Sequence, residues 1–274
     1  MRPYNNELAE IDTPEKAYLL GLFYSDGCIH HSSSYVSSVV LHEDDLYLLQ
    51  ELKRLFPFFT ISKMTNKAYV LKCTRKALFL DLINHGMYQR KSTDNKELLV
   101  IPKLNPNLFS HFIRGYFDGD GSVYKQKVGN TKIEIGGTSF RLITDIIKVL
   151  YDNKITVNLR CKYAGAGLRT QDYYILYTSS DKVSKEFANF IYKDCNDLYL
   201  KRKKDKLFYI PEYHRMERLV CPLCGGINTV RNGSRKMLHG LVYRGTCKDC
   251  NKQFSITAPL SSNTQSGGDE LLEG

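Results

Sequence analysis

The sequence predicts an α+β protein made of two similar αββαββα halves and a small C-terminal module. Two apolar segments, LLGLFYSDG at 19–27 and IRGYFDGDG at 113–121, each carry glycine at the third place and end in Asp-Gly. The order of helices and strands expected after the first segment recurs after the second, which indicates an internal duplication. Near the C-terminus, four cysteines form two Cys-x2-Cys pairs that mark a separate module.

The first apolar segment is predicted to be a helix that opens at Thr13-Pro14 and stops at Gly27. Threonine is a favourable N-cap, proline is favoured at the first helical position, and glycine commonly follows the last turn. The pattern of apolar residues then predicts, in order, strands at 28–31 and 35–41, a helix at 43–56, strands at 59–66 and 67–73, and a helix at 76–86.

The second half repeats this order from Asn105-Pro106, and its first helix stops at Gly121. The elements that follow are strands at 121–129 and 131–137, a helix at 140–153, strands at 155–165 and 172–180, and a helix at 181–194. Hairpins of this kind predict a four-stranded antiparallel sheet in each half, covered by helices on one face. The other face is then open or meets a partner.

The expected domain boundaries follow changes in composition along the chain. The first half spans 1–98 and the second spans 99–207, closing with the basic run KRKKDK at 201–206. Short strands and turns around the cysteines fill 208–260. The polar stretch 261–274 is expected to be disordered.

The composition is that of a globular protein with a basic surface. The 274 residues suffice for a sizeable core, and 42% of them are hydrophobic. No apolar run reaches the length of a bilayer span and the N-terminus lacks a signal-peptide core, so we expect an intracellular protein without a membrane partner. The net charge of +10 favours a polyanionic partner, although solubility alone would also explain it.

The two apolar helices carry small residues at matched places. Gly21 and Ser25 are four residues apart, and so are Gly115 and Gly119, which puts each pair on one helix face. Small residues there allow two backbones to approach closely. Such packing would bring Asp26 and Asp120 together at the negative ends of both helices, an arrangement that calls for a divalent cation held by oxygen ligands.

A calcium loop is the alternative interpretation of the stretch that begins at Asp118. This interpretation fails, because the sixth position of the loop is Val123 instead of glycine and the twelfth is Gly129 instead of glutamate.

The two motifs, LLGLFYSDG and IRGYFDGDG, resemble the paired motifs of LAGLIDADG homing endonucleases of the two-motif, single-chain, pseudo-dimeric type. The resemblance covers about residues 10–206. It implies catalytic Mg²⁺ at Asp26 and Asp120, with the glycines that follow them, Gly27 and Gly121, completing the site. It also implies that Gly21, Ser25, Gly115 and Gly119 form the helix interface. The family often has a further acid two places before the metal ligand, which Asp118 matches and Tyr24 does not.

The same resemblance implies metal-assisted hydrolysis of double-stranded DNA at a long target site, leaving short 3′ overhangs. A basic residue near each scissile phosphate would stabilise the developing charge. The family places a lysine after the last helix of each half, and here Lys91 and Lys203 stand at those places.

In such proteins the two sheets form a pseudo-twofold saddle over the DNA major groove, and side chains that alternate along the strands read the sequence. The contacts expected to DNA are polar, basic and aromatic strand residues, together with Arg202 from the basic run: His30, Tyr35, Ser37, Lys63, Tyr69, Lys125, Lys132, Arg160, Lys162 and Tyr173. A register error of one residue would reverse the set.

The C-terminal module has the spacing of a structural zinc site. Cys221, Cys224, Cys247 and Cys250 form two Cys-x2-Cys pairs separated by 22 residues, a pattern typical of a closed tetrahedral Zn²⁺ site. The stretch also resembles zinc ribbons of transposases, which favours a second DNA-binding module through Arg231, Arg235, Lys236 and Arg244. A folding staple or a protein-docking ribbon is the alternative.

The leading hypothesis is thus a monomeric, Mg²⁺-dependent, site-specific DNA endonuclease with a zinc ribbon. One alternative is a DNA-binding regulator without catalysis on the same scaffold. The other is an RNA maturase that assists splicing, with intron RNA as its partner. Retention of both Asp26 and Asp120 favours cutting.

Overall fold

The computed structural model divides the chain into two compact units, Met1–Pro211 and Glu212–Gly274, which we describe separately. The described residues are 8–64, 67–92, 94, 96–125, 131–165, 170–208, 219–237 and 240–258. The stretch 261–274, expected to be disordered, lies outside them. The boundaries expected at 98, 207 and 260 stay predictions.

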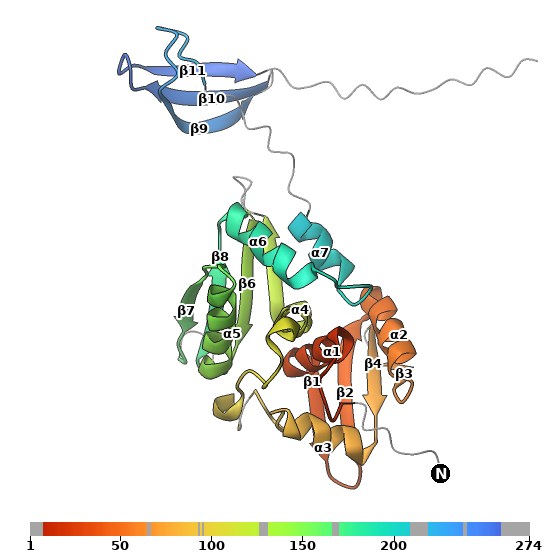
Figure 1. The fold of residues 1–274 in the computed structure, drawn as a ribbon. Helices are drawn as coiled ribbons and strands as arrows, with labels where there is room; N and C mark the ends of the chain where they lie inside the picture. Colours follow the sequence, from red (N-terminus) through yellow and green to blue (C-terminus); the bar gives the residue numbers. More distant parts are fainter. Residues whose placement is uncertain are drawn as a thin grey trace, which may run out of the picture. The chain divides into compact units, whose positions relative to one another are not determined.

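The first half of the larger unit has the predicted order of elements (Figure 1). They are α1 (Pro14–Ser25), β1 (Gly27–His31), β2 (Tyr35–His42), α2 (Leu46–Leu55), β3 (Thr60–Lys63), β4 (Ala68–Cys73) and α3 (Lys76–Asn84), with a short 3-10 turn at Glu43–Asp45 before α2. The strands form an antiparallel sheet in the order β1-β2-β4-β3.

The second half repeats this architecture and adds one helix. Its elements are α4 (Phe109–Asp120), β5 (Gly121–Lys125), β6 (Thr131–Gly137), α5 (Phe140–Asp152), β7 (Asn158–Lys162), β8 (Tyr173–Thr178), α6 (Asp181–Tyr192) and α7 (Lys201–Phe208). The sheet order, β5-β6-β8-β7, matches that of the first half. The duplicated fold predicted from the sequence is therefore confirmed.

The helix α7 was not predicted, because its sequence KRKKDK has the composition of a solvated basic run. In the structure this run is helical and buries Lys203 and Leu207 against the second half. One buried lysine among exposed ones cannot be recognised from composition.

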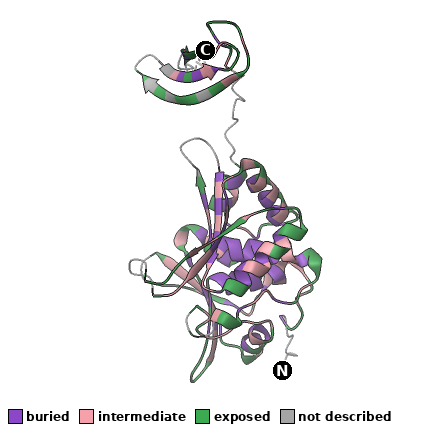
Figure 2. Cartoon of the chain, turned by 90° about the vertical axis from the view of Figure 1, so that its left-hand side faces the viewer, coloured by how far each residue is buried: buried purple, intermediate pink, exposed green. Residues whose placement is uncertain are grey.

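The helices α1 and α4 lie side by side at the centre of the larger unit (Figure 1). Every residue of α1 from Ala17 to Ser25 is buried, so the helix is apolar on all sides instead of amphipathic. Thr13 caps α1 by accepting a hydrogen bond from the Lys16 amide, and Asn105 caps the 3-10 turn before α4. Figure 2 shows the buried helical residues in the middle of this unit.

The two glycines that end the motifs are required for a different reason from the expected termination of a helix. Gly27 and Gly121 do not take the left-handed backbone conformation of a helix-terminating glycine, and each begins a strand. A Cβ at either position would overlap the backbone and ring of Phe23 or Phe117, respectively, one turn earlier. Glycine is needed here for space, so that the strand can leave immediately beside the helix.

The smaller unit contains a three-stranded antiparallel sheet in the order β11-β10-β9, from β9 (Thr229–Met237), β10 (Gly240–Cys247) and β11 (Gln253–Ala258). The described hydrophobic residues that are buried in this unit are Cys221, Tyr243, Cys247 and Phe254, with few partly buried neighbours. In neither unit is a described helix both long and apolar enough to cross a bilayer.

Candidate active site

The doubled helices approach each other closely because of the small residues in their motifs. A Cβ on Gly21 would overlap the carbonyl oxygen of Phe112, and one on Gly115 would overlap that of Tyr18. Near the C-terminal ends, a Cβ on Gly119 would overlap the hydroxyl of Ser25. The structure therefore places all four residues in the expected contact between the two helices.

This packing brings Asp26 and Asp120 into electrostatic contact. Burial, followed by the charge of Asp26, raises the pKa of Asp120 to about 6. Burial also raises the pKa of Asp26, against the opposing charges of Lys203 and Lys91. Each carboxyl stands at the C-terminal end of its helix, where the dipole disfavours negative charge. Two partly desolvated carboxylates with hard oxygen donors suit a divalent cation such as Mg²⁺.

A lysine from the end of each half reaches the backbone beside each acid. The Lys91 Nζ donates to the carbonyl oxygens of Ser25 and Gly27, at 2.7 and 2.8 Å. The Lys203 Nζ donates to those of Phe117, Asp118 and Gly119, at 2.8, 2.6 and 3.1 Å. Burial lowers the pKa of both lysines, that of Lys203 to about 8. Both lysines therefore bind backbone carbonyl groups where their own motif helix ends and the following strand begins.

Two buried residues around this centre, Tyr18 and Arg114, and the partners of Asp118 were not predicted from the sequence. The Asp118 carboxylate accepts hydrogen bonds from the Tyr18 hydroxyl at 2.8 Å and from the Leu200 amide at 3.0 Å. The Arg114 guanidinium donates to the carbonyls of Leu198 and Ile191, at 2.9 and 2.8 Å. These partners lie 77 to 100 residues apart in the chain, so no local pattern reveals them.

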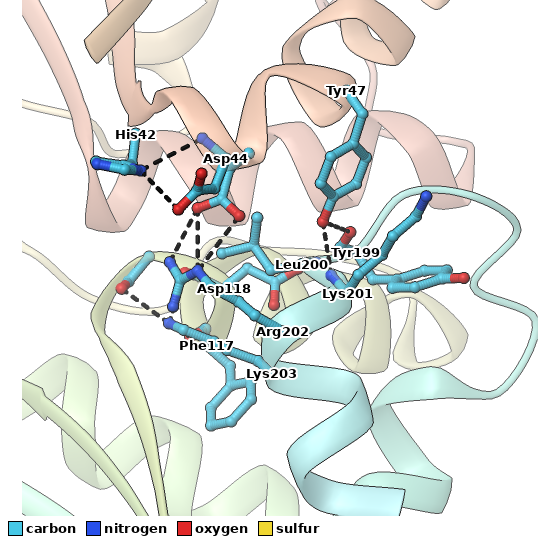
Figure 3. Close-up of polar contacts among 12 residues, drawn as sticks. His42, Asp44, Tyr47, Phe117, Asp118, Tyr199, Leu200, Lys201, Arg202 and Lys203 are labelled. Carbon is cyan, nitrogen blue, oxygen red and sulfur yellow. Dashed lines mark hydrogen bonds and ion pairs between the residues drawn. The ribbon is translucent and has the colours of Figure 1, made fainter. Parts of the chain in front are cut away.

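The start of α7 is also bound to the first half (Figure 3). Arg202 forms an ion pair with the buried carboxylate of Asp45, with 3.1 Å between Nη2 and Oδ2. The Tyr47 hydroxyl accepts a hydrogen bond from the Lys201 amide at 2.6 Å and donates one to the Tyr199 carbonyl at 3.2 Å. Arg202, expected to contact DNA, is thus engaged across the two halves.

The register of the first sheet places most of the expected DNA contacts on the helix-covered face. Tyr35 and Ser37 pair with His31 and Ile29, and Ser37 is fully buried. Lys63 and Tyr69 pair with each other on the same face. Among these first-half candidates, His30 alone lies on the open face. The expected set therefore has the wrong parity on β2, β3 and β4, where the open face carries Val36, Val40 and Val70, which resemble core residues.

The second sheet agrees better with the expectation. Lys132, Arg160, Lys162 and Tyr173 lie on its open face, with Tyr124, Glu134 and Tyr177 beside them. Glu134 pairs with both Lys132 and Arg160. Lys125 pairs in register with Thr131, and its side chain lies outside the described residues.

The four cysteines of the smaller unit converge as expected for a metal site. Their sulfur atoms all lie within 4.8 Å of one another, with Cys221 and Cys250 at 3.8 Å and Cys224 and Cys247 at 3.6 Å. Four ligands at the usual Zn–S distance in a tetrahedron would place their sulfurs about 3.8 Å apart. The cluster therefore fits Zn²⁺ in both donor type and spacing.

The expected DNA contacts of the smaller unit lie on two neighbouring strands. Arg235 on β9 and Arg244 on β10 are exposed. The side chains of Arg231 and Lys236 lie outside the described residues.

Comparison with known proteins places the larger unit in a family. A model of the LAGLIDADG-like domain matches the chain twice, at residues 13–95 and 110–191. The chain belongs to the LAGLIDADG family. The two matched regions contain both motif helices and both four-stranded sheets.

Solved structures similar to this LAGLIDADG protein include mesophilic variants of the homing endonuclease I-DmoI, at 19% identity, a TM-score of 0.46, and coverage of 65% of this chain and 94% of that one. I-DmoI in complex with DNA and Mn is 18% identical, with a TM-score of 0.46 and coverage of 65% of this chain and 97% of that one. The meganuclease I-AabMI bound to uncleaved DNA is 14% identical, with a TM-score of 0.47 and coverage of 71% of this chain and 87% of that one. No curated protein sequence matches the chain.

Proposed function

We propose that this chain is a site-specific double-strand DNA endonuclease of the homing type, dependent on Mg²⁺. The observation that carries the proposal is the meeting of Asp26 and Asp120 at the ends of α1 and α4, each with a lysine bound beside it. One motif per half supplies one acid for each DNA strand, so a monomer would cut both strands and leave short 3′ overhangs.

Asp26 and Asp120 would hold the metal through their carboxylates, and Gly27 and Gly121 would add backbone oxygens. The carbonyl of Gly27 accepts a hydrogen bond from Lys91 at 2.8 Å, so this lysine lies directly beside the expected ligand. Bound Mg²⁺ supplies Lewis acidity, lowering the pKa of a coordinated water and stabilising charge on the phosphate. Lys91 and Lys203 would place fixed positive charge where negative charge develops.

The open faces of the two sheets would bind the DNA major groove, which accommodates strands. His30 on the first sheet and Lys132, Arg160, Lys162 and Tyr173 on the second are the contacts that the register supports. The zinc ribbon would add a second DNA contact through Arg235 and Arg244, together with Arg231 and Lys236.

The proposal is tested by selection on a randomised duplex DNA library with purified full-length protein and Mg²⁺. Bound and cut molecules are sequenced separately for the native chain, for Asp26→Asn with Asp120→Asn, and for Lys148→Gln on the outer helix α5 as a matched control. We expect cut ends at one long site from the native and control chains, and binding without cutting from the double variant.

Other outcomes would contradict the proposal in distinguishable ways. An enriched bound site without cut ends would indicate a DNA-binding regulator. Absence of any enriched DNA would direct the same experiment to intron RNA.

A further inference from the structure

The residue two places before each metal-binding aspartate differs between the motifs, yet both residues are buried in matching places. Tyr24 in the first motif and Asp118 in the second are each 1% exposed. A hydroxyphenyl group and a carboxylate share no shape or charge. A common role must therefore lie in the backbone group to which each side chain is hydrogen-bonded.

In the first half, the Tyr24 hydroxyl donates to the carbonyl oxygen of His85 at 2.5 Å. His85 ends α3, and Gly86 follows with φ of +93°, a left-handed conformation that favours glycine. A Cβ on Gly86 would stand 2.6 Å from the Tyr24 hydroxyl oxygen. Tyr24 thus packs against the turn at His85 and Gly86, where the chain leaves α3. Lys91 follows five residues after Gly86.

In the second half, Asp118 binds the corresponding turn as a hydrogen-bond acceptor, whereas Tyr24 is a donor. Its carboxylate accepts from the Leu200 amide at 3.0 Å, immediately before α7 (Figure 3). The carbonyl of Leu200 accepts from the Lys203 amide at 3.0 Å and so begins the helix that carries this lysine. The Lys203 Nζ returns to the carbonyl of Asp118 itself.

We propose that Tyr24 and Asp118 are positioning residues, each of which sets the place of one lysine beside its metal-binding acid. The first segment presents a carbonyl and requires a donor, whereas the second presents an amide and requires an acceptor. This difference explains why a hydrogen-bond donor stands at this place in the first motif and an acceptor in the second. The catalytic meaning of the proposal rests on the endonuclease function proposed above, but the positioning itself does not.

The test compares the reactivity of both lysines in the full-length protein without DNA. The ε-amines are labelled by reductive methylation and quantified by mass spectrometry in the native chain, Tyr24→Phe, Asp118→Leu and Asp118→Asn. Tyr24→Phe removes only the donor. Asp118→Leu removes the acceptor at similar size, and Asp118→Asn retains a carbonyl acceptor.

We expect Tyr24→Phe to speed the labelling of Lys91 on the order of tenfold, as for loss of one buried hydrogen bond, and to leave Lys203 unchanged. Asp118→Leu should speed the labelling of Lys203 and leave that of Lys91 unchanged. Asp118→Asn should label both lysines at nearly the native rates. Equal acceleration of both lysines in either variant would indicate general loosening and overturn the proposal. Unchanged rates, or an Asn variant that behaves as the Leu variant, would overturn it as well.

Strand-specific cleavage separates this proposal from the proposed function. The measurement uses a duplex in which each strand carries its own label. Tyr24→Phe should slow cleavage of the same strand as Lys91→Met does. Asp118→Leu should slow cleavage of the same strand as Lys203→Met does. A native chain that cuts no DNA would contradict the endonuclease, while the labelling pattern would still decide the positioning. A native chain that cuts, with variants lacking this strand bias, would overturn the positioning alone.

Discussion

At the scale of single residues, His111 makes stability depend on acid pH. Burial and the adjacent Arg114 guanidinium lower the pKa of His111 to about 4. Its Nδ1 accepts a hydrogen bond from the Arg114 Nη1 at 2.8 Å, which requires the neutral ring. In the unfolded chain the ring takes up a proton near pH 6.5, so the folded state loses stability as pH falls from about 6.5 to about 4.

The variant His111→Asn should remove this pH dependence, because an amide oxygen can accept the same hydrogen bond without titrating. Unfolding free energies from urea titrations between pH 7.5 and 4 check the prediction. The native chain should lose up to about 3 kcal/mol relative to the variant over that range. Parallel curves for the two proteins would show that His111 is not the titrating group.

Which site residues the sequence could predict depends on whether a local motif contains them. Asp26, Asp120 and the small residues of the helix interface stand inside the two repeated motifs, so duplication alone revealed them. Asp45 and Arg114 act through partners 157 and 84 residues away. Arg114 lies within the second motif, but the motif does not indicate which distant groups it binds. Pairing at such sequence distances is set by the tertiary fold, between the two halves for Asp45 and within the second half for Arg114.

At the scale of elements, the three strands of the ribbon should depend on zinc. The buried hydrophobic residues described there are Cys221, Tyr243, Cys247 and Phe254, far too little apolar area to offset the entropy of folding. Metal binding by the four thiolates would therefore supply the folding free energy. We expect one Zn²⁺ per chain by elemental analysis, and chelation should expose residues 219–258 to rapid amide exchange while residues 8–208 keep their protection.

Cysteine variants provide the matched comparison for that prediction. Cys224→Ser should reproduce the effect of chelation, whereas Cys195→Ser, in the larger unit, should leave the ribbon protected. A chain without zinc whose ribbon exchanges slowly would contradict the prediction.

Apart from α7, the element order of the larger unit was predictable, but strand parity was not. Helical spacing and hairpin turns are local signals, and they placed all eight strands of the two sheets correctly. The face of a strand is decided by which side the helices cover. In the first sheet the valines at 36, 40 and 70 are on the open side, against the usual alternation.

At the scale of the larger unit, one hydrophobic core joins the two halves while their open faces differ in charge. Core residues from both halves form a single cluster around α1 and α4. The open face of the first sheet carries Lys72 as its one permanently charged residue, by register. That of the second carries Lys132, Arg160 and Lys162 against Glu134. The second sheet therefore has the larger net positive charge.

If these faces bind DNA, the second sheet should contribute more to the salt dependence of binding. Lys132→Gln with Arg160→Gln and Lys162→Gln removes three cations, but Glu134 neutralises about one of them. The slope of log affinity against log salt should then become shallower by about 1.8, against about 0.9 for Lys72→Gln. Lys148→Gln, on the outer helix α5, is the control and should leave the slope unchanged. The slopes are measured by fluorescence anisotropy on a duplex of fixed sequence at several salt concentrations. Equal changes for Lys148 and the sheet variants would show that DNA binds elsewhere on the protein.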